Sequence, residues 1–455
     1  MENIREFREH IEELIERKSF FELKKLLGNA EAADIAEALN EISREEYTVA
    51  YRLLPKELAS DVFVEMEPEA KEHLIATFSD REIRAVIEEL YTDDAADLLE
   101  EMPANVVRRL LANTPAETRN VLNELLQYPE NSAGSIMTTE YVTLKRDMTA
   151  DEAIEQIRSD AVDSETVYTC YVAENRRLVG VISVRELLLM QKNAKVGEAM
   201  TEHVVSVFTG DDREAAAALF GRYGFIALPV VDAEHRLVGI ITVDDAMEVI
   251  QEETEEDFAK MAAITPSDKP YLRTSAMRIW RSRIPWLLLL MVSATFTGMI
   301  ITGFENALAA QVVLTSFIPM LMDTGGNSGS QASVTVIRGI SLGEISFRDL
   351  PRVVWKEFQV SILCGATLAA ATFVKILLVD RLLMHAEVTV LIAAVVCVTL
   401  CFTVLCAKLI GCTLPMIAKK LGFDPAVMAS PFITTIVDAV SLLVYFGIAR
   451  ALLGI

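Results

Sequence analysis

Ser430 to Phe446 reads SPFITTIVDAVSLLVYF, an apolar run with a single carboxylate, Asp438, near its middle. Its length and composition predict a membrane-spanning helix. An ionised side chain at the centre of a bilayer costs about 3 kcal/mol or more, so such a residue normally faces a water-filled path or an ionic partner. We therefore predict that Asp438 lines an ion pore. A buried ion pair with Lys375 or Lys408 is the alternative.

The two halves of the chain differ sharply in charge. Hydrophobic residues make up 52 % of the 455 residues and the mean hydropathy is +0.31, both high for a soluble protein. Residues 1–270 carry 57 acidic and 28 basic side chains, a net −29, whereas residues 271–455 carry 9 and 14, a net +5. An acidic half of that size repels nucleic acid and concentrates cations, so nucleic acid is excluded as a partner.

Residues 1–130 are predicted to form an acidic, all-α domain. Apolar side chains recur there at helical spacing, and prolines stand where helices are expected to begin. Residues 59–68 and 95–103 are weakly similar to each other, which indicates a small superhelical array of short helices. A solvated helix face is the alternative explanation for any one of its many acidic residues. The prolines are Pro55, Pro68, Pro103 and Pro115.

Residues 131–250 contain a repeat. LVGVISVREL at 178–187 is matched by LVGIITVDDA at 237–246, and IMT at 136–138 is matched by AMT at 199–201. This pattern implies two copies of one α/β unit. The layout resembles a tandem pair of CBS domains, the modules named after cystathionine β-synthase. CBS pairs generally sense ligands, so the resemblance implies regulation rather than catalysis.

The same resemblance implies a nucleotide site. Thr242 and Asp245 match the ribose and phosphate contact motif of CBS domains, whereas the first copy has Ser183 and Glu186 at these positions. We therefore expect ATP or another adenine nucleotide at the second copy.

Residues 251–283 are predicted to form a connecting helix between the CBS pair and the membrane region. The run VIQEETEEDFAKMAA, which begins at Val249, is strongly acidic, and its position makes it a candidate coupling element. A plain soluble linker helix is the alternative. Basic residues next to a span favour the cytoplasmic side, so we expect the N-terminal half inside the cell. Those preceding the first span are Arg273, Arg278, Arg281 and Arg283.

Residues 284–455 are predicted to cross the membrane five times. The second span contains Pro319 and the run DTGGNSG at 323–329, which favour an interrupted helix. Irregular backbone at membrane depth survives only beside protein or a water-filled cavity, so we expect free carbonyl groups along an ion path here. Alternatively, Asp323 caps a helix that resumes after the glycines. The expected spans are residues 284–304, 307–340, 358–379, 388–410 and 426–449.

Basic residues between the spans predict the orientation. They lie between the second and third spans and between the fourth and fifth, which places both connections in the cytoplasm if the N-terminus is inside. The C-terminus is then outside, in a multi-pass protein of the plasma (inner) membrane surrounded by lipid. The residues concerned are Arg338, Arg348, Arg352, Lys356, Lys419 and Lys420.

The domain order, with the runs PMLMDTGGNSGSQ and DPAVMASPFITTIVD, resembles the MgtE family of magnesium transporters and channels. The resemblance implies a homodimer whose pore lies at the subunit interface, lined by the second and fifth spans. It assigns Asp438 to hydrated Mg²⁺ and places Gly326 and Asn327 in the interrupted segment. Ser430 and Thr434 lie about two turns and one turn before Asp438 on the same helix face, and we predict them as further pore residues.

The acidic half is predicted to regulate the pore. Carboxylates that face one another repel until divalent cations bridge them, so binding favours the arrangement that brings them together. The family resemblance implies that this arrangement closes the pore when cytosolic Mg²⁺ is high. The candidate regulatory ligands are Asp61, Asp93, Asp97, Asp245, Glu253, Glu256 and Asp257.

Residue chemistry independently favours a hard cation. Mg²⁺ prefers oxygen ligands and keeps its waters, which suits one carboxylate per subunit. The sequence contains no zinc-type His/Cys cluster, no P-loop and no recognisable nucleophile and base pair, so we expect passive Mg²⁺ entry and no enzyme activity. A membrane sensor that transports no ion and a transporter of Co²⁺ or Mn²⁺ are the alternatives.

Overall fold

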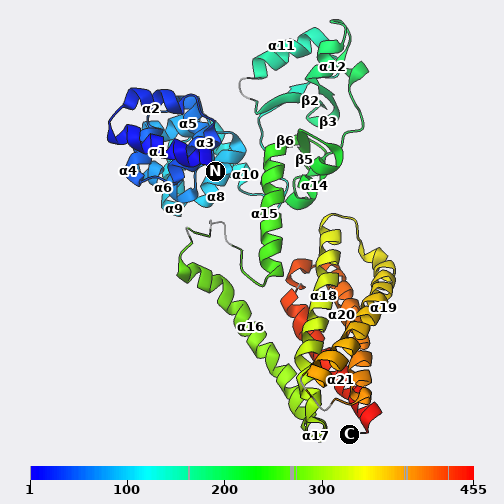
Figure 1. The fold of residues 1–455 in the computed structure, drawn as a ribbon. Coiled ribbons are helices and arrows are strands. Elements are labelled where there is room, and N and C mark those ends of the chain that lie inside the picture. Colours follow the sequence, from blue (N-terminus) through cyan, green and yellow to red (C-terminus); the bar gives the residue numbers. More distant parts are fainter. Residues whose placement is uncertain are drawn as a thin grey trace. The chain divides into compact units, whose positions relative to one another are not determined.

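The computed structural model describes residues 2–161, 164–266, 271–272, 274–383, 385, 388–428 and 430–454. Two compact units, residues 1–250 and 251–455, divide the chain (Figure 1). The helix α15 (Val243–Met261) begins in the first unit and ends in the second. Of the arginines predicted to flank the first span, Arg273 lies outside the described residues.

Residues 2–125 are all-α, as predicted. Each of the four prolines named above lies at a helix start, either as the residue before the first turn or within it. Ser43 and Ser79 begin two other helices with reciprocal hydrogen bonds to the glutamate three residues later. The helices are α1 (Glu2–Glu16), α2 (Phe20–Leu27), α3 (Ala32–Asn40), α4 (Arg44–Tyr51), α5 (Lys56–Val64), α6 (Pro68–Thr77), α7 (Asp80–Ile87), α8 (Thr92–Glu101), α9 (Ala104–Asn113) and α10 (Ala116–Leu125).

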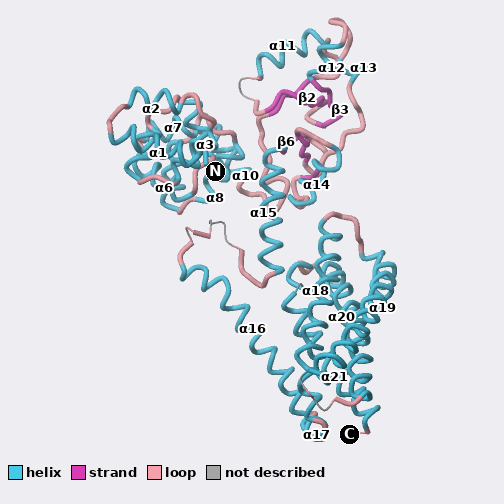
Figure 2. The backbone as a smooth tube through the Cα atoms, in the orientation of Figure 1, coloured by secondary structure: helices cyan, strands magenta, loops and turns pink. Residues whose placement is uncertain are grey.

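The predicted repeat forms two similar α/β copies, and Figure 2 shows their strands in magenta. In each three-stranded sheet the first pair of strands is parallel and the second pair antiparallel. The first copy contains β1 (Tyr141–Leu144), α11 (Ala150–Asp160), β2 (Thr166–Glu174), β3 (Arg177–Ser183) and α12 (Val184–Leu189). The second contains α13 (Val196–Ala199), β4 (Val207–Phe208), α14 (Arg213–Tyr223), β5 (Ala227–Val231), β6 (Leu237–Thr242) and α15.

The Met-Thr segment at the start of each copy packs against the sheet of the other copy. Thr138, which precedes the first sheet, bridges to Ile240 in the second. A Cβ atom on Gly239 would lie only 2.8 Å from the backbone oxygen of Thr138 and 2.6 Å from Met137 Sδ, so this position favours glycine. Each packing contact therefore joins the Met-Thr motif of one copy to the glycine-containing motif of the other. The corresponding residues of the other copy are Gly180, Val181, Met200 and Thr201.

The second unit is helical. In its described part, four helical segments are long and apolar enough to cross a membrane, and they correspond to the expected first, third, fourth and fifth spans. Their helices are α16 (Ala276–Gly303), α19 (Leu350–Lys375) with a π-helical continuation (Ile376–Leu383), α20 (Val390–Lys420) and α21 (Ser430–Leu453). Shorter elements are α17 (Glu305–Ala310) and the 3₁₀ turns Val312–Phe317, Phe347–Asp349 and Pro425–Met428.

The expected second span contains α18 (Ile318–Ser341), and the predicted interruption is wrong. The helix continues through Asp323 to Gly329, and Pro319 lies in its first turn, where proline is tolerated. Its 24 residues extend about 36 Å, enough to cross a bilayer. Figure 1 shows α18 alongside α20 and α21, and apolar residues of all three helices share one core.

Helix packing explains why the glycines leave α18 intact. A Cβ atom on Gly325 would lie 2.7 Å from Thr403 Cγ2 and 2.8 Å from Ser441 Oγ. A Cβ atom on Gly329 would lie 2.8 Å from Ile433 Cγ2. The glycines therefore allow close contact with α20 and α21, and that packing offsets their poor helix propensity.

Candidate ion path and acidic cluster

One face of α18 is polar and uncovered. Its side chains recur every three or four residues, so they form a single stripe along the helix. The Nδ2 atom of Asn327 donates a hydrogen bond to Asp323 Oδ1 at 3.2 Å. Asp323 therefore lies inside the helix, and the alternative that it caps a new helix is wrong. The exposed polar residues are Asp323, Asn327, Gln331, Thr335 and Arg338.

The neighbouring face of α18 crosses α21. Gly326 is buried, and a Cβ atom there would lie 3.0 Å from Thr434 Cγ2. The hydroxyl group of Thr434 donates to the carbonyl oxygen of Pro431 at 2.9 Å. Asp438 lies one turn further along α21, half-buried and close enough to Asp323 for the two charges to interact. The structure thus brings Gly326, Thr434 and Asp438, three of the five predicted pore residues, to this crossing, and Asn327 lies on the polar stripe of α18. The fifth, Ser430, begins α21, and its side chain lies outside the described part.

Neither lysine considered as a partner of Asp438 pairs with it. Lys375 Nζ lies 2.9 Å from both carboxylate oxygens of Asp380, and Lys408 Nζ lies 3.7 Å from Glu357 Oε2. Among the described residues, Asp438 has no ion pair. The alternative of a buried ion pair with Lys375 or Lys408 is therefore not found.

Because α18 is a continuous helix, the groups that it can offer to an ion differ from those predicted from the sequence. Its backbone carbonyls accept hydrogen bonds within the helix, so the predicted free carbonyls are absent from Asp323 to Gly329. Side-chain oxygens of the stripe and of α21 are the groups available to a hydrated ion. Gly326 contributes close packing against Thr434 instead of a ligand.

Three carboxylates meet in the first unit. Asp93 lies in the first turn of α8, Glu165 just precedes β2, and Asp245 lies in the first turn of α15. One oxygen atom from each lies within 4.8 Å of the other two. Asp93 is 6 % exposed, and the backbone N–H of Asp94 donates to its Oδ1 at 2.9 Å. We call Asp93, Glu165 and Asp245 the acidic cluster.

The acidic cluster lacks a compensating charge within the described residues. Burial and the neighbouring carboxylates raise the pKa of Asp93 well above its ordinary value and raise that of Glu165 to about 8. Burial and Asp245 likewise raise the pKa of Asp94 to about 7. The Oε2 atom of Glu165 is buried without a hydrogen-bond partner. Three crowded hard oxygen ligands of this kind fit Mg²⁺ or Ca²⁺.

A cavity of about 600 Å³ is lined by the acidic cluster and by Asp61. Asp97 is exposed on α8, one turn after Asp93. Sequence reasoning did not select Glu165 or Asp94. No motif marks Glu165, because only the folded chain brings the start of β2 to α8.

The predicted connector acids belong to the second unit. Glu256 Oε1 lies 2.5 Å from Lys260 Nζ, which also lies 2.6 Å from Asp424 Oδ2. Asp257 accepts a hydrogen bond from the Ser341 hydroxyl at 3.3 Å. Glu253 lies on the same helix, α15. The single predicted set of regulatory acids therefore falls into two groups.

The predicted nucleotide motif also caps a helix. Asp245 Oδ2 accepts hydrogen bonds from the hydroxyl and the backbone N–H of Thr242, at 2.5 and 3.3 Å. Ser183 and Glu186 make the equivalent contacts at the start of α12. Tyr168 and Ile226, 66 % and 48 % exposed, line the same cavity as Thr242 and Asp245. This part of the cavity therefore offers an aromatic and an aliphatic face.

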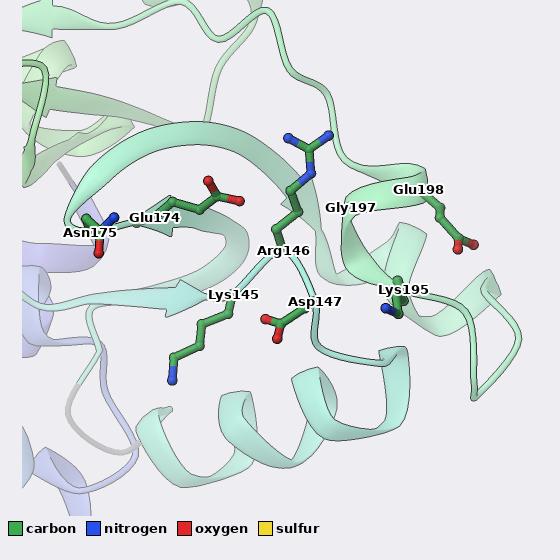
Figure 3. Close-up of a pocket in the computed structure, with 9 residues that line it drawn as sticks. Lys145, Arg146, Asp147, Glu174, Asn175, Lys195, Gly197 and Glu198 are labelled. Carbon is green, nitrogen blue, oxygen red and sulfur yellow. The ribbon is translucent and has the colours of Figure 1, made fainter.

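Another hollow, of about 690 Å³, lies on the first CBS-like copy (Figure 3). Its wall consists of the residues after β1, the β2–β3 turn and the start of α13. Its charged side chains are exposed and balanced in sign, which describes a solvated surface. They are Lys145, Arg146, Lys195, Asp147, Glu174 and Glu198.

Divalent binding at the acidic cluster should depend strongly on pH. A carboxylate whose pKa is raised by folding stabilises the folded state at pH values below its pKa in the unfolded state, which is near 4. This stabilisation is lost as the pH rises through its pKa in the folded state. Without metal, we therefore expect the protein to resist thermal unfolding less at pH 8 than at pH 6. The Mg²⁺ concentration that gives half-maximal protection should be at least about ten-fold lower at pH 8, because fewer protons must leave the carboxylates when Mg²⁺ binds.

Thermal unfolding of the full chain in detergent, with chelator or with graded Mg²⁺, measures this linkage. Glu165→Gln removes the group whose pKa is about 8 and should flatten the dependence. The exposed substitution Glu37→Gln is the matched control. Equal Mg²⁺ protection at the two pH values would contradict the prediction.

Comparisons with known proteins cover nearly the whole chain. The model of the MgtE divalent cation transporter family matches residues 318–448, that of the MgtE intracellular N domain matches residues 30–131, and CBS domains match residues 133–192 and 196–252.

Individual proteins give the same picture. The magnesium transporter MgtE of Thermus thermophilus is 36 % identical over 436 residues, 95 % of each chain. That of Bacillus subtilis is 35 % identical over 397 residues, 86 % of this chain and 85 % of the relative. A crystal structure of the cytosolic domain of the Mg²⁺ channel MgtE in complex with ATP has a TM-score of 0.51 at 36 % identity, covering 52 % of this chain and 98 % of that one.

Proposed function

Because the chain belongs to the MgtE family of magnesium transporters, we propose that it conducts Mg²⁺ across the membrane along a path formed by α18 and α21. The observation that carries this proposal is Asp438, a carboxylate at a helix crossing in a membrane-type bundle, without an ion-pair partner in the described residues. Such a charge is costly unless water and a cation reach it.

The polar stripe supports a homodimer. A lipid-facing row containing Asp323, Asn327 and Gln331 would be unfavourable, since hydrocarbon cannot satisfy polar groups. A second copy of the chain, packed about a two-fold axis, would cover both stripes and place two Asp438 carboxylates around one path. The oxygen-rich lining suits a hydrated Mg²⁺ ion.

Closure by cytosolic Mg²⁺ is the regulation that we propose. The acidic cluster is strained by mutual repulsion without metal, so Mg²⁺ stabilises the conformation that holds Asp93, Glu165 and Asp245 together. Cytosolic sensing requires the N-terminal unit inside the cell and, with five crossings, the C-terminus outside. The four-part division at residues 130, 250 and 283 stays a prediction.

Nucleotide binding is proposed at the second CBS copy. Tyr168 and Ile226 offer faces for an adenine ring, and Asp245 is available to ribose hydroxyl groups. Calorimetry on the full chain should detect one ATP site per chain, weakened at least about ten-fold by Tyr168→Ala. Tyr271→Ala, also exposed, is the matched control. No heat with millimolar ATP would remove the nucleotide from the mechanism.

Mg²⁺ flux into proteoliposomes tests the function itself. The purified chain should carry Mg²⁺ down an imposed gradient without ATP, faster at low than at high Mg²⁺ on the cytoplasmic side. Absence of flux at every Mg²⁺ level would favour the sensor that transports no ion. Competition by Co²⁺ and Mn²⁺ in the same assay measures selectivity.

A further inference from the structure

Lys408 is a buried cation that the proposed ion path does not use. It is 4 % exposed and lies on α20, about 18 Å along the helix from the basic end at Lys420. Its ammonium group lies 3.7 Å from Glu357 Oε2, too far for a hydrogen bond. That oxygen is itself buried with no hydrogen-bond partner. The pair is therefore held loosely, in a place where charges are expensive.

Lys408 also lies beside the polar stripe of α18. A groove of about 530 Å³ separates α18 from α19, and Lys408 of α20 forms part of its wall. The α18 side contributes Asp323, Asn327 and Gln331, and the α19 side contributes Thr367. The groove is large and polar enough for water, so a hydrated cation that enters the stripe can also enter the groove.

The negative charges around the groove are partly offset by a single residue. Asp323 and Glu357 supply two negative charges, and among the described residues of this groove and its adjoining pair Lys408 supplies the positive one. Without the ammonium group, the two carboxylates would attract a divalent ion into the groove, away from the path across the membrane. An ion held there would repel the next ion on the path and slow transport.

We propose that Lys408 is a fixed positive charge that keeps divalent ions out of the groove and on the path. This inference rests on the proposed function, because it assumes that ions move along the stripe. It adds to that function a fixed charge which sets how tightly the path holds its ion. Loose pairing with Glu357 leaves the ammonium field effective in the groove.

Four variants test the proposal in the full chain. Lys408→Met leaves Glu357 uncompensated, so an ion trapped in the groove should lower the maximal rate of Mg²⁺ flux at least ten-fold. Glu357→Gln leaves Lys408 unopposed and should raise the KM at least ten-fold. Lys408→Arg keeps the charge, and Lys408→Met with Glu357→Gln keeps the balance, so both should stay within about three-fold of the parent.

Binding of Mn²⁺, followed by electron paramagnetic resonance, gives a readout that does not depend on transport. Lys408→Met should bind one additional Mn²⁺ per chain, and the double variant should not. If the parent carries no Mg²⁺, the proposed function fails, yet the Mn²⁺ count still tests the charge at the groove.

Two results would overturn the inference. One is an unchanged maximal rate and Mn²⁺ count in Lys408→Met. The other is a double variant that behaves like Lys408→Met, since the effect would then come from packing. If Lys408→Met does not fold, an unchanged KM in Glu357→Gln decides against the proposal.

Discussion

Replacing Asp438 by asparagine is expected to lower Mg²⁺ flux in proteoliposomes by at least about a hundred-fold. A divalent ion about 5 Å from one carboxylate gains on the order of 7 kcal/mol at an effective dielectric constant of about 20. Asparagine keeps the shape and an oxygen atom but removes the charge. In the proposed homodimer each substitution removes two charges from one path.

Glu344→Gln is the matched control for this result. Glu344 is an exposed acid between α18 and α19, so its loss changes the charge of the same unit equally without touching the crossing. We expect parent-like flux from it. Size-exclusion profiles of both variants should match the parent. Flux within three-fold of the parent in a well-folded Asp438→Asn protein would remove Asp438 from the path.

The membrane part shows what a sequence predicts well and what it does not. Long apolar runs and the isolated charge of Asp438 follow from composition, because the bilayer imposes length and hydrophobicity. The glycines at 325, 326 and 329 are ambiguous, since glycine both weakens a helix and permits close helix packing. Only contacts with Thr403, Ile433 and Thr434 show that packing prevails here.

The acidic cluster shows the same limit for a site. As candidate metal ligands, Asp93 and Asp245 stand out in the sequence only as acids of a strongly acidic half, a pattern shared by many solvated residues. Glu165 carries no such signal and joins them only through the sheet that begins at β2. Connector acids such as Glu256 were grouped with them by charge alone, although Glu256 contacts Lys260 in the other unit.

Neutralising the acidic cluster is expected to abolish closure by internal Mg²⁺. Any single substitution should shift the Mg²⁺ concentration for half-closure only a few-fold, because the remaining carboxylates still bind. Asp93→Asn, Glu165→Gln and Asp245→Asn together remove the repulsion that Mg²⁺ relieves and the ligands that hold it. We expect the triple variant to need at least about a hundred-fold more Mg²⁺ for half-closure, a coupling loss of about 2.7 kcal/mol.

Two measurements on the triple variant separate gating from loss of fold. Flux at low Mg²⁺ should equal that of the parent, and Mg²⁺ should no longer protect residues 249–261 of α15 against proteolysis. The matched control is Glu16→Gln, Glu37→Gln and Glu117→Gln, which removes three exposed charges from helices of the same unit. This control should close like the parent if local geometry, and not the net charge of the acidic half, senses Mg²⁺. If the triple cluster variant closes and is protected at the same Mg²⁺ concentration as the parent, the sensor lies elsewhere. The connector acids Glu253, Glu256 and Asp257 would then be the next group to neutralise.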